Sequence, residues 1–149
     1  LASYYADGTV LDVWLCSNDS TALGVAQAIE SDYAGTNSII VTGQDGDVAN
    51  LANIVDGKQT MTVYKNVMDE AVVTLALVQA MFAGEVDGAA LAGSFGVPCA
   101  FDTESYETTP GTKVASFLLV PTTVTKDNLN YLVDIGLYTM DDAGYLQAK

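Results

Sequence analysis

The sequence predicts an α/β fold with a mostly parallel sheet, and two observations lead to this prediction. Short apolar segments rich in β-branched residues alternate with amphipathic helical segments along the first half of the chain. Half of the 149 residues are hydrophobic, which is enough for a folded domain with a buried core. Repeated strand–helix–strand units place their strands parallel in one sheet covered by helices, because the crossovers are right-handed.

The first unit contains a strand and a helix. Residues 10–16 (VLDVWLC) are apolar and β-branched, as in a buried strand. The polar segment after them contains Asp19 and Ser20, either of which could be the N-cap residue of the next helix. The apolar face of this helix would contain Ala22, Val25, Ala26 and Ile29.

The same pattern then repeats. Residues 38–42 (SIIVT) predict a second strand, and the helix after it would begin at Asp47 and end at Gly57. Residues 60–64 (TMTVY) predict a third strand. These strands and helices together indicate the α/β arrangement.

The rest of the chain is less regular. Residues 67–82 predict a long helix. Residues 84–112 are rich in glycine, threonine, proline and acidic residues without a sustained period, so they predict a long loop. Residues 114–120 (VASFLLV) predict the last strand, and Thr125 or Asp127 would begin a final helix.

Charge and the absence of histidine argue against several classes of function. Five basic residues against nineteen acidic ones give a net charge of −14, which repels phosphate backbones, so nucleic acid is not an expected partner. Without histidine, the chain lacks the usual general base and the commonest metal ligand. No nucleophile–base pair and no Walker motif stands out in the sequence. We therefore predict that the protein is not an enzyme and uses no cofactor and no metal.

The two cysteines leave the redox compartment open. Cys16 lies in an apolar run and Cys99 in a loop-like stretch. They permit either one disulfide or two free thiols.

Polar residues directly follow the three predicted strands of the first half. Asn18, Asp45 and Lys65 each come just after an apolar run. The carboxyl ends of parallel strands meet at one edge of the sheet, where ligands of such folds bind. A monosaccharide needs both donors and acceptors around its hydroxyls, because an unpaired buried polar group costs about 1–3 kcal/mol. An ionised carboxylate, an ammonium group and an amide supply both, so the sequence predicts that these three side chains converge on a sugar.

Each of these residues also has a plainer interpretation. Asn18 could be a helix cap, Asp45 a turn residue in GQDGD, and Lys65 an exposed charge at a strand end. Asp45 and Asp47 resemble part of a calcium loop, but the ligand ladder and terminal glutamate of an EF-hand do not follow. The residues alone leave the binding and the structural interpretations open.

Three segments of the chain carry a specific family resemblance. They are, in order, SNDSTALGVAQAI, IIVTGQDGDVANLANIVDGKQTMTVYK and LLVPTTVTKDNL. Together they resemble the C-terminal half of type I periplasmic sugar-binding proteins, in the branch that binds xylose, glucose and galactose. The resemblance covers residues 10–82 and 114–138. It implies a partial periplasmic-binding-protein-like type I fold with three layers, helices on both faces of the sheet.

The resemblance also implies a function and a set of site residues. It implies that the protein binds a monosaccharide as the solute-binding component of an ABC sugar importer and delivers it to the permease subunits. Asn18, Asp45 and Lys65 fall where this family holds sugar hydroxyls, and Gln44 is a weaker candidate for lining the cleft. The alternative is the effector-sensing domain of a LacI-type transcription regulator, which would need a basic helix-turn-helix upstream.

The resemblance further implies two lobes joined by hinge crossings. Residues 1–65 would belong to the distal lobe and end at a hinge crossing. Residues 66–113 would form a helix and a long loop packed toward the proximal lobe, and residues 114–149 the last hinge strand and a C-terminal helix.

Members of this family are considerably longer than this chain, so the resemblance implies a longer parent protein with an N-terminal half that is missing here. We expect apolar surface that binds either this missing half or a second copy of the chain. The resemblance also implies an exported protein, either periplasmic or a membrane-anchored lipoprotein outside the cell, with its export signal upstream.

Overall fold

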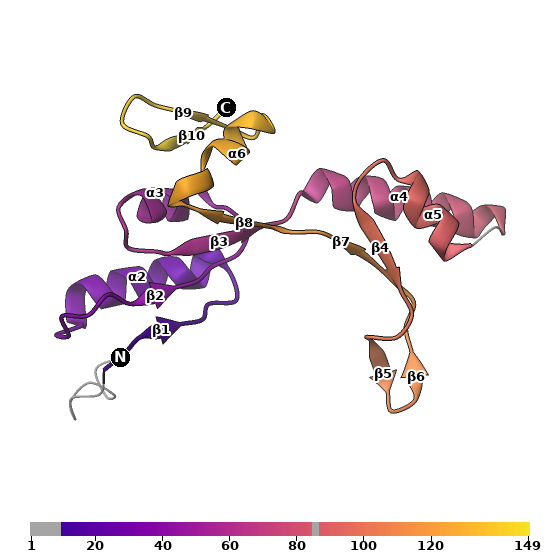
Figure 1. Ribbon diagram of the computed structural model, residues 1–149, viewed down its shortest axis with the longest axis horizontal. Helices are drawn as coiled ribbons and strands as arrows, with labels where there is room; N and C mark the ends of the chain where they lie inside the picture. The colour runs from indigo at the N-terminus through magenta and orange to yellow at the C-terminus, as the bar shows by residue number, and fades with distance from the viewer. Residues whose placement is uncertain (1–9, 85–86) are drawn as a thin grey trace. The chain divides into compact units, whose positions relative to one another are not determined.

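The computed structural model describes residues 10–84 and 87–149, which form two compact units (Figure 1). Unit 1 comprises the chain up to Lys65 together with Thr122–Lys149, and unit 2 comprises Asn66–Pro121. The chain therefore passes between the units after Lys65 and again after Pro121.

Unit 1 contains the predicted parallel strands. β1 (Val13–Trp14) pairs in parallel with β2 (Ile40–Val41). Both strands are shorter than predicted, because a side chain replaces part of the main-chain hydrogen bonding between them. The Cys16 amide donates to Thr42 Oγ1 at 3.1 Å rather than to a main-chain carbonyl. The parallel arrangement predicted for these strands is confirmed.

The same layer continues through β3 to an antiparallel strand. β3 (Met61–Tyr64) is joined to the chain after β2 by a parallel bridge between Gln44 and Val63. β8 (Thr122–Thr125) runs antiparallel to β3, and the two strands lie side by side (Figure 1). The sequence did not predict β8, because its threonine-rich segment follows a proline and has no long apolar run.

Capping residues determine where the helices of unit 1 begin. α2 (Asp19–Asp32) has Asn18 as its N-cap residue, and the Asn18 Oδ1 accepts from the Thr21 amide at 2.9 Å. The prediction that Asp19 or Ser20 is the cap was therefore wrong. α3 (Val48–Val55) begins after Asp47 as predicted.

The C-terminal part of unit 1 begins with a capping box and ends in a hairpin. The Thr125 side chain caps the short 3-10 helix η1 (Lys126–Asn128), and α6 (Asn130–Asp134) follows it. β9 (Tyr138–Met140) and β10 (Leu146–Ala148) then form an antiparallel pair that was not predicted. The main core cluster joins these elements to α3, β3 and β8, and contains Leu51, Ile54, Tyr64, Val124, Leu129, Leu132 and Leu146.

Unit 2 begins with the predicted long helix, α4 (Val67–Ala83), which ends at the left-handed Gly84. α5 (Gly88–Ser94) follows, and β4 (Cys99–Asp102) pairs antiparallel with β7 (Ser116–Leu119). The prediction that residues 84–112 form a loop was wrong.

The irregular segment is ordered by contacts that no local pattern encodes. Phe101 lies opposite Phe117 across the β4–β7 ladder, and Phe117 also makes an edge contact with Phe95. These aromatic pairs join parts of the chain that are distant in sequence. The strands are too short to show a period by themselves.

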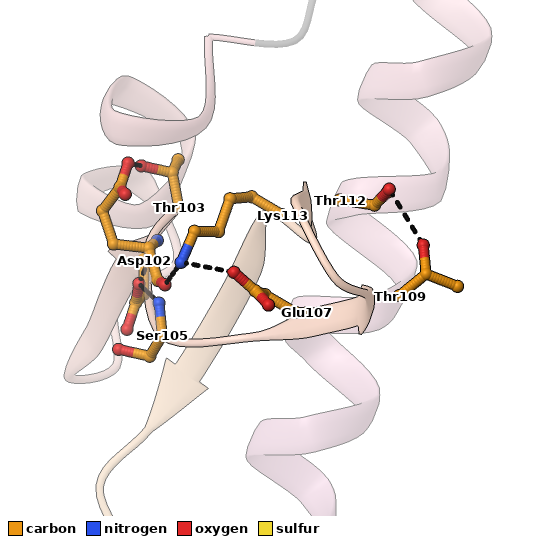
Figure 2. Close-up of polar contacts among 8 residues, drawn as sticks. Asp102, Thr103, Ser105, Glu107, Thr109, Thr112 and Lys113 are labelled. Carbon is orange, nitrogen blue, oxygen red and sulfur yellow. Dashed lines mark hydrogen bonds and ion pairs between the residues drawn. The ribbon is translucent and has the colours of Figure 1, made fainter.

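A small exposed hairpin completes unit 2. β5 (Glu107–Thr109) pairs with β6 (Thr112–Lys113), and the Thr109 hydroxyl donates to the Thr112 hydroxyl at 3.0 Å. Figure 2 shows the Lys113 ammonium group beside Glu107, and the Nζ–Oε1 distance is 3.1 Å. The Lys113 Nζ also donates to the Glu104 carbonyl oxygen at 2.6 Å. Because the ion pair is exposed to solvent, it contributes only about 0–1 kcal/mol to stability.

Cys16 and Cys99 are both free thiols. Cys16 lies in unit 1 and Cys99 in unit 2. The sequence left open either one disulfide or two free thiols, and the structure has two free thiols.

Leu132→Ala tests the core of unit 1. Leu132 is fully buried in the main cluster, so its truncation is expected to lower the free energy of unfolding by about 2–5 kcal/mol. Chemical denaturation measures this. Leu15→Ala is the matched control, because Leu15 is 78% exposed and its truncation should change stability by no more than about 0.5 kcal/mol. Equal effects of the two substitutions would contradict the assigned core.

Candidate functional site

Backbone hydrogen bonds bring the carboxyl ends of β1, β2 and β3 to one edge of unit 1. The Asp19 amide, at the start of α2, donates to the Gln44 carbonyl at 2.7 Å. The Asp45 amide donates to the Val63 carbonyl at 2.9 Å. The residues that follow these three strands therefore lie close together, as parallel strand ends should.

Asp45 and Lys65 form an ion pair at this edge. Their Oδ1 and Nζ atoms are 3.7 Å apart, and the two side chains are 45% and 42% exposed. A pair this exposed adds little to stability. Its carboxylate and ammonium groups are accessible to a ligand, and displacing water from them would strengthen their hydrogen bonds.

Asn18 and Gln44 are both half-buried at the same edge. Asn18 uses its Oδ1 to cap α2, so the structural interpretation of this residue is correct for that atom. The Asn18 Nδ2 makes no hydrogen bond within the described part of the chain, so an amide donor remains for a ligand. Gln44 takes part through its backbone, with the parallel bridge to Val63 and the carbonyl that accepts from Asp19.

Asp19, which no sequence pattern marked as a site residue, organises this edge. Asp19 is completely buried, and its Oδ2 accepts hydrogen bonds from the amides of Gly46 and Asp47, each at 2.9 Å. The same oxygen accepts from Thr62 Oγ1 at 3.0 Å, and Asp19 Oδ1 accepts from Gln59 Nε2 at 3.0 Å. Burial raises the pKa of Asp19 above its ordinary value, against these hydrogen bonds, which lower it.

A buried polar network extends from Asp19. The Asn50 Nδ2 donates to the Asp19 carbonyl at 2.8 Å and to Gln59 Oε1 at 2.7 Å. A Cβ atom at Gly43 would overlap the Asp19 carboxylate, so only glycine fits at that position. Every buried side-chain nitrogen and oxygen in the described residues has a partner. Polar residues at inward positions, such as Thr62 in β3, are the sequence signal that could have revealed this network.

The backbone conformation of the 43–47 loop is unusual. Asp45 has a φ of 111°, and among the described residues it is the one non-glycine residue in the left-handed region. Gly46 follows with a φ of 78°. The two residues turn the chain so that the Asp45 side chain lies next to Lys65.

Two other features are absent from the described residues. These residues contain no group of three or more cysteine, aspartate or glutamate side chains that could hold a metal ion. Within the same residues, no helix combines the length and apolarity that crossing a lipid bilayer requires.

Comparison with known proteins identifies the family of the chain and several similar sugar receptors. The model of a family with the description "Periplasmic binding protein domain" matches residues 1–85 of the chain. The multiple sugar-binding periplasmic receptor ChvE of Rhizobium radiobacter is 33% identical over 146 residues, which cover 95% of this chain. The D-xylose-binding periplasmic protein of Escherichia coli is 40% identical over 60 residues, or 40% of this chain. The chain spans 37% of the length of ChvE, and its match covers 18% of the xylose-binding protein.

Solved structures extend this likeness to the fold. A solute-binding protein of an ABC transporter from Clostridium phytofermentans, with bound β-D-glucose, has a TM-score of 0.72 and 43% sequence identity. The match covers 95% of this chain and 40% of that protein. A carbohydrate transporter solute-binding protein from Chloroflexus aurantiacus, in complex with D-glucose, has a TM-score of 0.67 at 27% identity, covering 93% and 38%. The predicted periplasmic-binding-protein-like α/β fold, in partial form, is confirmed.

Asp19→Asn tests the buried network. The amide that replaces the carboxylate must point its NH₂ group at another donor, either Gln59 Nε2 or the backbone amides. We expect the free energy of unfolding at neutral pH to fall by about 1–3 kcal/mol. Denaturant unfolding measures the change, with the exposed Asp127→Asn as the matched control. A loss no larger than that of the control would contradict the role of Asp19.

The pH dependence of the same variant has a defined sign. The folded-state pKa of Asp19 is raised, so the folded protein favours the protonated carboxyl group. The contribution of this group to the free energy of unfolding is fully present below about pH 4, and it is lost as pH rises through the raised pKa. The difference in unfolding free energy, wild type minus Asp19→Asn, should therefore decrease as pH rises from about 4. Denaturation curves over this range provide the test, and a difference that grows with pH would refute the assignment.

Proposed function

The chain belongs to the periplasmic binding protein domain family, and on this basis we propose that it holds a monosaccharide as part of the solute-binding component of an ABC sugar importer. The observation that carries the proposal is the accessible Asp45–Lys65 pair at the edge where three strand ends meet. The relatives add support, since ChvE is a multiple sugar-binding receptor and two related structures contain glucose.

The polar groups at this edge match the needs of a sugar. The Asp45 carboxylate accepts protons from hydroxyls, the Lys65 ammonium group donates to their oxygens, and the Asn18 Nδ2 adds a neutral donor. We also assign Gln44, the neighbour of Asp45 in the chain, to the lining of the sugar site. The ligand is a pentose or hexose of the xylose, glucose or galactose type, and its binding is reversible, without chemical change. No cofactor takes part.

The division of the chain into units supports a hinge between two lobes. We assign unit 1 to the distal lobe and unit 2 to the proximal lobe, with hinge crossings after Lys65 and after Pro121. The remaining ligands of the sugar come from a longer parent protein, because the relatives are more than twice the length of this chain.

The proposal includes location and partners. The relatives are periplasmic receptors, so we infer an exported protein that acts outside the cytoplasmic membrane. It would deliver its sugar to the permease subunits of the importer. A lipid anchor is an alternative means of keeping it near the permease.

Asp45→Asn tests the site in the parent protein. Asparagine tolerates the left-handed backbone conformation, so the substitution removes the charge without new strain. Isothermal titration with D-glucose and D-xylose should show an affinity loss of about tenfold to a hundredfold, because hydrogen bonds to charged groups are the strong ones. Asp127→Asn should leave affinity unchanged. Wild-type protein that binds none of a panel of pentoses and hexoses would remove the proposed function.

α4 presents an apolar surface that needs a partner. Phe82 is 90% exposed and Met68 70%, and within α4 only Val73 is buried. Exposed patches of this kind mark interfaces. We propose that the missing part of the parent protein covers α4, and that the isolated chain associates with itself through the same surface.

Association of the isolated chain can be measured by light scattering at increasing concentration. The pair Leu75→Ser and Phe82→Ser should lower the apparent mass, because both side chains are exposed on α4. Gln79→Ser is the matched control on the same helix, where a polar side chain is exposed. A wild-type chain that stays monomeric at high concentration would rule out self-association.

A further inference from the structure

The peptide group between Gly46 and Asp47 is held at both ends by side chains from distant parts of unit 1. Its N–H group, on Asp47, donates to Asp19 Oδ2 at 2.9 Å. Its carbonyl group, on Gly46, accepts from the Tyr138 hydroxyl at 3.0 Å. Asp19 lies at the start of α2 and Tyr138 in β9. Two elements that are far apart in sequence therefore fix one peptide plane, which lies one residue beyond Asp45.

The preceding peptide group is fixed as well. The Gly46 amide donates to Asp19 Oδ2 at 2.9 Å, with Thr62 Oγ1 at 3.3 Å as a second acceptor. Asp45 itself has a φ of 111°, which costs on the order of 1–3 kcal/mol for a non-glycine residue. Such a conformation persists only where the surroundings determine it, and here the surroundings are these hydrogen bonds.

We propose that Asp19 and Tyr138 are positioning residues, which fix the 43–47 loop so that the Asp45 carboxylate meets Lys65 and the ligand without touching the ligand themselves. The proposal rests on the proposed function, since it assigns sugar affinity to that edge. It makes the C-terminal hairpin of β9 and β10 part of the binding apparatus. Nothing in the local sequence around Asp45 indicates this contribution.

The Tyr138 hydroxyl is suited to this role at neutral pH. Burial raises its pKa above the ordinary tyrosine value, and the nearby charges of Asp47 and Asp19 raise it further. The hydroxyl therefore keeps its proton and remains a donor to the Gly46 carbonyl.

The same hairpin offers a matched control. The Tyr145 hydroxyl, in the turn before β10, donates to Asp56 Oδ1 at 2.6 Å and ties the hairpin to the end of α3. Tyr145→Phe thus removes one hydroxyl and one hydrogen bond, as Tyr138→Phe does. It leaves the 43–47 loop untouched, so it separates loop positioning from general support of the hairpin.

Two measurements on these variants test the proposal. In the parent protein, titration with D-glucose and D-xylose should show an affinity loss of about threefold to tenfold for Tyr138→Phe and none for Tyr145→Phe. In the 149-residue chain, amide hydrogen exchange at Asp47 should be faster in Tyr138→Phe than in Tyr145→Phe. Each variant removes one hydroxyl group from the hairpin and keeps the aromatic ring, so a difference in exchange at Asp47 between them reports on the loop.

The outcomes separate this inference from the proposed function. Equal affinity losses in the two variants, or none in Tyr138→Phe, would overturn the positioning role while sugar binding stands. Wild-type protein that binds no sugar would overturn the proposed function. In that case faster exchange at Asp47 in Tyr138→Phe would still support loop positioning, and unchanged exchange would reject it.

Discussion

The candidate site depends on one buried carboxylate. Asp19 has no solvent exposure, and no ion pair with a lysine is found for it in the described residues. A buried charge is costly unless hydrogen bonds compensate for the lost hydration. Two backbone amides and two side chains provide that compensation. These donors come from the 43–47 loop, from Gln59 and from β3, so satisfying one carboxylate fixes the relative positions of three segments.

This constraint connects the packing of unit 1 to its chemistry. The groups that satisfy Asp19 face inward, while Asp45 and Lys65 in the same segments face solvent at the strand ends. A rigid inner network and an accessible outer pair suit a site that binds a polar ligand with little rearrangement of the loop. The backbone strain at Asp45 is consistent with this arrangement, since strain is commonly found where the surroundings hold a functional residue.

Sequence reasoning succeeded where a pattern is long or the chemistry is local. The helix α4 was predicted as a long apolar helical segment, and the parallel strands were predicted from short β-branched apolar runs. Asp47 was recognised as a helix-start residue, and Thr125 was one of two candidates for the next start. It failed for β4, whose partner strand β7 is distant in sequence, and for the hairpin of β9 and β10, whose strands are too short to show a period.

The candidate site likewise contains one feature that the sequence predicts and one that it does not. The closeness of Asp45 and Lys65 follows from the rule that parallel strand ends meet at one edge. The role of Asp19 does not, because a carboxylate at a helix start is usually a cap or an exposed charge. Asn18 took the cap position, which left Asp19 to turn inward among Gln59 and Thr62. Only the assembled fold reveals that exchange of roles.

A crystal structure of the parent protein with bound D-glucose is the decisive experiment for the Asp45–Lys65 site. We expect hydroxyl groups of the sugar to lie within hydrogen-bonding distance of the Asp45 carboxylate and the Lys65 Nζ, with Asp19 still buried behind the loop. A sugar bound away from this edge, with the Asp45–Lys65 pair left in solvent, would contradict it.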